Sequence, residues 1–196
     1  MVTGTYAPLR SRVIAFAYDY ILIAGYLAGT VAAGMLLYAS FPATAALFAG
    51  PVSGQLAAFF VVTLPIGLYF ILTESSARQA TWGKQRQGLH VTRSDGARLS
   101  VFRAAGRTAL KFVPWELAHT CIWHLKAAPQ SPPSWTTWGL ALVWTLVGAN
   151  LACAWLSPTR QALYDRIAGT VVTSRAAGAG ASSHERCAPA GGRAIM

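Results

Sequence analysis

One carboxylate, Asp19, lies inside the first long apolar run of the chain, seven residues after Arg12. An ionisable group inside a bilayer span costs roughly 2.5–3.5 kcal/mol, so it is usually paired, turned inward or used for function. On a helix that rises 1.5 Å per residue, the two residues stand about 10.5 Å apart, too far for a local ion pair. Arg12 can extend to lipid phosphates, whereas Asp19 needs another partner, for which Lys84 is one candidate.

Two interpretations of Asp19 remain open at this stage. In the first, its carboxylate binds and releases a proton or a cation as part of a transport process. In the second, it is a buried group held by Ser, Thr, Tyr or Lys side chains, and it fixes the packing of helices.

Glu116 and His119 are three residues apart, so on a helix they share one face. This is also the spacing of metal-binding helices in carboxylate bundles, but such sites need a second motif that this chain lacks. We therefore expect no metal site and interpret Glu116 and His119 as supporting polar contacts inside a helical bundle. The chain has no recognisable Ser/His/Asp or Cys/His set, so we expect neither enzymatic activity nor a cofactor.

Composition indicates a membrane protein. Hydrophobic residues make up 54% of the 196 residues and charged residues only 11%, against about 25% charged in soluble domains. The net charge of +10 would suggest nucleic acid in a soluble protein. Cytoplasmic loops of membrane proteins are also rich in Lys and Arg, and this explanation is the simpler one, so we expect no nucleic-acid partner.

Four apolar runs are candidates for transmembrane helices, because a span needs roughly 20 residues. They cover residues 13–38, 56–73, 110–125 and 135–156. Gly25 and Gly29 form a GxxxG pattern that would let another helix approach closely. Pro65 is expected to kink the second span because it has no backbone donor.

The segment between the second and third spans is strongly basic. Asp95-Gly96 between two short alternating runs predicts a β-hairpin, and the chain from Val101 onward predicts an amphipathic helix on the membrane surface. Its polar side would carry Arg103, Arg107 and Lys111. The fold class expected is thus an all-α membrane protein with four transmembrane helices, a cytoplasmic β-hairpin and an interfacial amphipathic helix.

Charge also predicts orientation. Basic residues cluster in the N-terminal arm, in residues 78–111 and in residues 160–175, while the loops 40–55 and 127–134 carry no charge. The positive-inside rule then places both termini in the cytoplasm, which requires an even number of crossings and makes 110–125 a span. Residues 174–196 are rich in Gly, Ala and Ser and are predicted to form a disordered cytoplasmic tail.

Several pieces of sequence occur together in order. These are Arg12 with Asp19, Thr81-Trp-Gly83-Lys84, Gly88-Leu-His-Val before Asp95-Gly96, and Asp165 to Val172. Over residues 9–173 they resemble the RDD family of small membrane proteins, named for one arginine and two aspartates. The resemblance implies a bacterial or archaeal cytoplasmic membrane and makes Arg12, Asp19 and Asp165 the signature residues. For this family transport has been proposed, including cation/proton antiport.

The segment with Thr81, Gly83 and Lys84 looks like part of a phosphate loop, but it lacks the glycine spacing and the preceding strand. A tight turn at the membrane surface explains it better, with Lys84 at the headgroups or near Asp19.

Two classes of function follow. The first is transport of a cation or small solute, coupled to protons through Asp19. The second is a non-catalytic scaffold or assembly factor of a membrane complex, which docks through its basic cytoplasmic face. The expected partners are the bilayer with its anionic headgroups and either further copies of the chain or a membrane complex.

Overall fold

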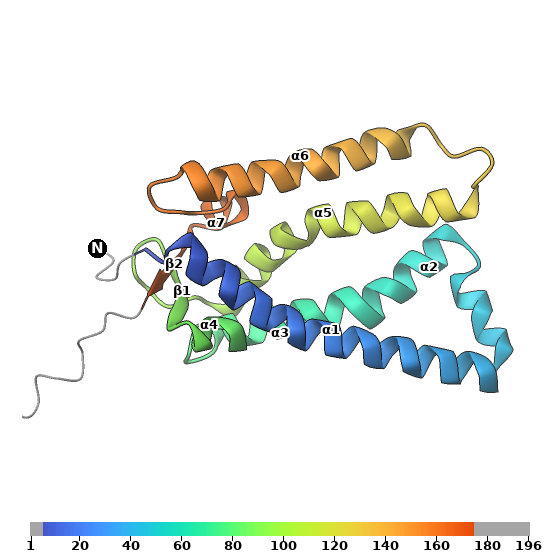
Figure 1. Ribbon diagram of the computed structural model, residues 1–196, viewed down its shortest axis with the longest axis horizontal. Coiled ribbons are helices and arrows are strands. Elements are labelled where there is room, and N and C mark those ends of the chain that lie inside the picture. Colours follow the sequence, from blue (N-terminus) through green and yellow to red (C-terminus); the bar gives the residue numbers. More distant parts are fainter. Residues whose placement is uncertain (1–5, 175–196) are drawn as a thin grey trace, which may run out of the picture.

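Four helical rods alternate in direction along the chain in the computed structural model, which describes residues 6–174 (Figure 1). The first rod is α1 (Leu9–Ser40), and the second is built from α2 (Pro51–Ala58), η2 (Phe59–Thr63) and α3 (Leu64–Ser75). The third and fourth rods are α5 (Val101–Ala127) and α6 (Trp135–Leu156). The alternation brings both ends of the described chain to the same end of the molecule.

The short elements lie mostly at that same end (Figure 1). They are α4 (Trp82–Arg86), β1 (Leu89–Arg93), α7 (Leu163–Ile167) and β2 (Thr170–Ser174). At the opposite end, η1 (Pro42–Phe48) links the first two rods inside the segment predicted as a loop.

Within residues 6–174, three helices are long and apolar enough to cross a membrane: Leu9–Ser40, Pro51–Ser75 and Trp135–Leu156. The predicted fourth span agrees with α6, whereas the first two are several residues longer than predicted. In α1 none of the most apolar window is buried inside the protein, and in α6 only 6% of it is. Such all-round apolar exposure is typical of helices that face lipid.

The second rod contains the predicted irregularity around Pro65. The π-helical segment η2 ends just before this proline. Because Pro65 has no N–H to give to the carbonyl of Val61, that carbonyl is free for another donor, and the hydroxyl of Tyr26 donates to it. The proline thereby creates a hydrogen-bonded link between the first and second rods.

The predicted interfacial helix is wrong as a separate element. Residues 101–127 form one continuous helix, α5, which contains both that segment and the predicted span 110–125. Arg107 does not lie on a solvated polar face, because only 2% of it is exposed. Phe102, in contrast, is 90% exposed. Arg107 faces the protein interior because it forms ion pairs with two buried carboxylates, Glu74 and Asp165.

The predicted β-hairpin is also wrong. Around Asp95-Gly96 the chain turns, but Thr92 and Arg98 form only an isolated bridge. The strand β1 pairs instead with β2, antiparallel, with Val91 opposite Val172. The second strand comes from far along the chain, so the short-range turn signal could not reveal it.

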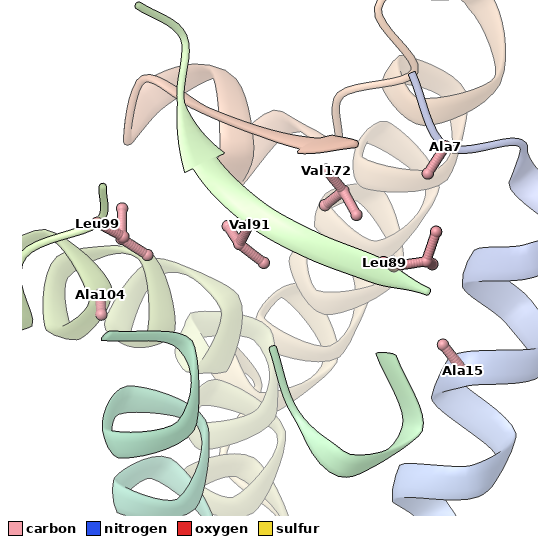
Figure 2. Packing of buried hydrophobic residues seen from close by; sticks show 7 residues of the cluster. All are labelled: Ala7, Ala15, Leu89, Val91, Leu99, Ala104 and Val172. Carbon is pink, nitrogen blue, oxygen red and sulfur yellow. The ribbon is translucent and has the colours of Figure 1, made fainter. Parts of the chain in front are cut away.

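A small apolar core surrounds the sheet. It comprises Ala7, Ala15, Leu89, Val91, Leu99, Ala104 and Val172. In Figure 2, Ala15 of α1 lies near the Leu89 end of β1, whereas Leu99, just before α5, and Ala104 in the first turns of α5 lie towards the other end of the strand. The backbone N–H of Ala7 donates to the carbonyl of Val172 at 3.1 Å. The sheet therefore ties the beginning of the first rod to the end of the described chain.

Two further predictions concern helix packing and the tail. A Cβ added at Gly25 or Gly29 would meet no atom within 4 Å, so within residues 6–174 no helix uses the GxxxG pattern for close approach. Of the predicted tail, Ser174 closes β2, and residues 175–196 lie outside the part of the chain that is described.

Cysteine pairs test the register of the sheet. In a background with the native cysteines replaced by alanine, Thr92→Cys with Val171→Cys should form a disulfide on mild oxidation, because these residues are direct partners. Opposed residues on antiparallel strands have Cβ atoms about 4.5–5.5 Å apart. Mass spectrometry of the linked peptides measures the yield.

The control is Thr92→Cys with Val172→Cys, in which a shift of one residue sends the side chains to opposite faces. Equal yields from the two pairs would contradict the register.

Candidate functional site

Charged side chains from five helices meet at the end of the molecule that carries the sheet, and we call this group the ionic cluster: Arg12, Glu74, Lys84, Arg107 and Asp165. The three central members, Glu74, Arg107 and Asp165, are each exposed by 2% or less. They belong to α3, α5 and α7. Three segments that are distant in sequence are thus joined through charges removed from solvent.

Arg107 bridges the two buried carboxylates. Its Nη1 donates to Oε2 of Glu74 at 2.6 Å, and its Nε donates to Oδ1 of Asp165 at 2.8 Å. Glu74 also accepts from Nζ of Lys84, so the same carboxylate attaches α4. Breaking such a pair is costly because it leaves an uncompensated charge in a buried site.

Arg12 lies at the edge of this cluster rather than at lipid phosphates. Its guanidinium donates to the carbonyls of Arg160 and Val172, and it stands 4.0 Å from Asp165. The expected extension to headgroups is therefore wrong, because both Nη groups of Arg12 donate to carbonyls of the protein. The first signature residue holds the C-terminal segment against α1.

Asp165 has a further hydrogen-bond partner in β2, and its neighbour Tyr164 lies against Arg107. The hydroxyl of Thr170 donates to Oδ1 of Asp165 at 3.0 Å, and Arg107 lies 5.1 Å from the centre of the Tyr164 ring. Burial, with the Asp165 carboxylate adding to it, raises the pKa of Tyr164 to about 12. Tyr164 therefore stays uncharged at physiological pH beside the ion pairs.

Asp19 accepts hydrogen bonds from three uncharged donors. The hydroxyls of Tyr69 and Thr81 and the backbone N–H of Gly83 lie at 2.8, 2.6 and 2.8 Å. Lys84, the partner suggested by sequence, pairs with Glu74 instead. Asp19 is 2% exposed, and its contacts hold the first rod to the second rod and to α4.

Gly83 is required by this close approach. A Cβ at this position would collide with the carbonyl oxygen of Ala15 and lie 2.9 Å from the carboxyl carbon of Asp19. Thr81, the N-cap of α4, also accepts a hydrogen bond from the N–H of Lys84. The turn predicted around Thr81, Gly83 and Lys84 is therefore a short helix built around the Asp19 carboxylate.

A cavity of about 110 Å³ lies between the ionic cluster and Asp19. Lys111 also lines this cavity, with its ammonium group 3.3 Å from the centre of the Phe70 ring. No carboxylate of the described chain lies within ion-pair distance of Lys111. The cavity therefore places an acidic side chain and an unpaired cation on one small internal space.

Glu116 belongs to a separate polar group farther along α5. Its carboxylate accepts from Nε2 of Gln55 at 2.6 Å and from the hydroxyl of Thr63, as expected for a polar contact between rods. His119 contacts the carbonyl and the ring of Trp115 instead. Across residues 6–174, no group of three His, Cys, Asp or Glu side chains is placed to hold a metal.

Glu74 and Arg107 are the important residues that sequence reasoning missed. Glu74 directly follows the predicted span 56–73 and has no predicted role, and Arg107 is predicted to lie on the polar side of the interfacial helix. One signal was available, because an acid at the end of an apolar helix needs a cation. The choice among the many basic residues of 78–111 depends on the tertiary structure.

The apolar rods, the buried charges at one end and the small sheet define a largely helical membrane-type protein. The RDD family model matches residues 6–169. The chain therefore belongs to the RDD family, as its arginine and aspartate residues indicated. Comparisons with curated proteins and with solved structures gave no match.

Removal of one carboxylate should reveal the contribution of the ionic cluster. Glu74→Gln leaves Arg107 and Lys84 without their shared counter-charge, so the free energy of unfolding should fall by about 3–5 kcal/mol. Thermal denaturation of the detergent-solubilised protein measures the change.

The control is Asp95→Asn, since Asp95 is 52% exposed and pairs with Arg93 at the surface. It should change stability by less than about 1 kcal/mol. Equal shifts for the two variants would show that the buried pairs do not dominate.

Glycine substitutions provide an independent test of the Asp19 contacts. Gly83→Ala should strongly lower the melting temperature and the folded yield, because the added methyl group collides with the backbone of α1. Gly106→Ala is the control. It adds a methyl group to open space within α5 and should stabilise the helix by about 0.5–1 kcal/mol. A Gly83→Ala protein as stable as wild type would contradict the packing of α4 on α1.

Proposed function

We propose that this RDD protein is a non-enzymatic transporter that moves a cation or small solute, coupled to protons, past Asp19. One observation carries the proposal: Asp19 lines the internal cavity, yet all three of its hydrogen-bond donors are uncharged. Glu74 and Asp165, in contrast, share Arg107 as a cationic partner, and each has a second cation, Lys84 or Arg12, within ion-pair distance. An acid without a paired cation is free to exchange a proton or a cation when its hydroxyl donors turn away.

The membrane arrangement that we propose has four crossings, with α5 as the third. Its 27 residues span about 40 Å at 1.5 Å per residue, and it packs along α6. Both ends of the described chain lie beside the basic segment (Figure 1). By the positive-inside rule, we place this end and both termini in the cytoplasm of a prokaryotic cell.

Exposed arginines at this end support contact with anionic headgroups. They include Arg78, Arg86, Arg98, Arg103 and Arg166. Each cation near an anionic surface contributes about 1 kcal/mol to binding. The ring of Trp82, a residue between the spans, stacks on Arg86 and adds an apolar group of the kind that lies at interfaces.

A scaffold or assembly role is the second candidate, and the same Asp19 contacts favour it. Because they join α1, α3 and α4, the carboxylate also has a structural role that needs no titration. In this alternative the exposed arginines dock an acidic partner protein. If the protein is instead a transporter, we expect further copies of the chain to pack against the exposed apolar faces of α1 and α6 and to complete the transport pathway.

Flux through proteoliposomes separates the two candidates. With Na⁺, K⁺ and Li⁺ gradients and a pH-sensitive dye inside the vesicles, the wild type should exchange cations for protons. Asp19→Asn should lose at least about tenfold of this rate, since the amide cannot carry a proton in exchange.

Asp95→Asn is the matched control and should leave the rate unchanged, because Asp95 lies on the exposed turn. Melting curves establish that each variant is folded. Transport is refuted if folded Asp19→Asn keeps the wild-type rate, or if the wild type moves none of these cations, and the scaffold role is then preferred.

A further inference from the structure

An apolar groove lies between the second rod and α5, separate from the Asp19 cavity. Its volume is about 420 Å³, within the range of about 300–1,000 Å³ found for small-molecule sites. The walls are largely apolar, from Phe59, Leu64, Leu68, Ile71, Phe112 and Val113. Three side chains with polar atoms also line it: Thr63, Thr108 and Glu116.

Glu116 brings to the groove a carboxyl group that has no cationic partner among the described residues. Both of its hydrogen-bond donors, Gln55 and Thr63, are neutral. Along residues 6–174, none of the Lys, Arg or His side chains forms an ion pair with it. A carboxylate has about four acceptor positions, so two donors leave room for a further positive group.

Thr108 is a second polar feature of the groove that lacks a partner. The residue is 3% exposed, and its hydroxyl oxygen makes no hydrogen bond within the described chain. A buried polar group without a partner costs about 1–3 kcal/mol. The wall of the groove therefore contains a buried hydroxyl group without a partner.

The backbone near the groove is irregular in a way that is common at binding sites. The π-helical turn η2 carries two groove residues, Phe59 and Thr63. Single π-helical turns inside helices frequently occur at functional sites. The hydroxyl of Thr63 also accepts from Nε1 of Trp115 at 3.2 Å, which fixes the donor that faces Glu116.

We propose that this groove binds a hydrophobic organic cation, with its apolar body against the rods and its positive charge beside Glu116. Charge complementarity identifies this class of ligand, because a neutral acyl chain would fill the apolar walls but leave the carboxylate uncompensated. The site differs from the Asp19 cavity, and its occupation does not depend on transport.

Two ions of matched shape and opposite charge provide the test: tetraphenylphosphonium and tetraphenylborate. Equilibrium dialysis against the full chain in detergent, with protein-free micelles subtracted, measures binding of each. The cation should bind at least about tenfold more tightly than the anion. Comparable binding of the two ions would overturn the proposal and indicate a simple apolar groove of the kind that an acyl chain fills.

Glu116→Gln should weaken binding of the cation by about tenfold or more. Its one amide oxygen can still accept from the hydroxyl of Thr63, and a flip of the Gln55 amide lets the oxygen of Gln55 accept from the new NH2 group. Asp95→Asn is the matched control and should bind like wild type. Unchanged cation binding by Glu116→Gln would overturn the proposal.

A steric variant decides the question if Glu116→Gln does not fold. Ala109 lines the groove and is exposed, so Ala109→Trp should block the cation without disturbing the buried rods. Ala141→Trp, at an exposed position on α6, is the control. Cation binding that survives Ala109→Trp would place it outside this groove and overturn the proposal. Because no flux is measured, a failure here is distinct from a failure of the transport proposal.

Discussion

The guanidinium of Arg107 is the contact on which the rest of the structure depends. It lies between Glu74 and Asp165, and all three side chains are buried. Asp165 stands five residues before Thr170, where β2 begins, so this ion pair also positions the strand that pairs with β1. Glu74 in turn holds Lys84 and thereby α4. Loss of one charge would leave its partners in a low-dielectric site, which gives the arrangement its specificity.

The other end of the molecule has no comparable constraint within the described residues. The rods are tied together beneath the sheet, while the apolar windows of α1 and α6 are almost entirely exposed. The hydrophobic effect gives apolar helices no reason to bury one another in lipid. The polar contacts at one end thus fix the positions of the helices, and the apolar remainder of the helices is suited to contact with lipid.

Hydrogen-bond partners divide the carboxylates of the described helices into two classes. Glu74 and Asp165 have cationic partners and serve as counter-charges in the frame. Asp19 and Glu116 have only neutral donors. Asp19 faces the small cavity near the basic end, and Glu116 faces the apolar groove. The two sites differ in surroundings and consequently in the ligands that they could accept.

The sequence by itself determined the class of protein and the apolar rods, and its resemblance to the RDD family singled out Arg12, Asp19 and Asp165 as signature residues. These features are local, because a run of apolar residues must be helical in lipid and an acid within it must be paired or used. The tertiary structure decided which partners those residues have. It replaced the local hairpin by a sheet between β1 and β2, merged the interfacial helix with the third rod, and gave Lys84 to Glu74 rather than to Asp19. The sequence offers many arginines as possible partners of the buried carboxylates, and it does not show which segment pairs with β1. Only the packing of the chain in three dimensions selects these partners.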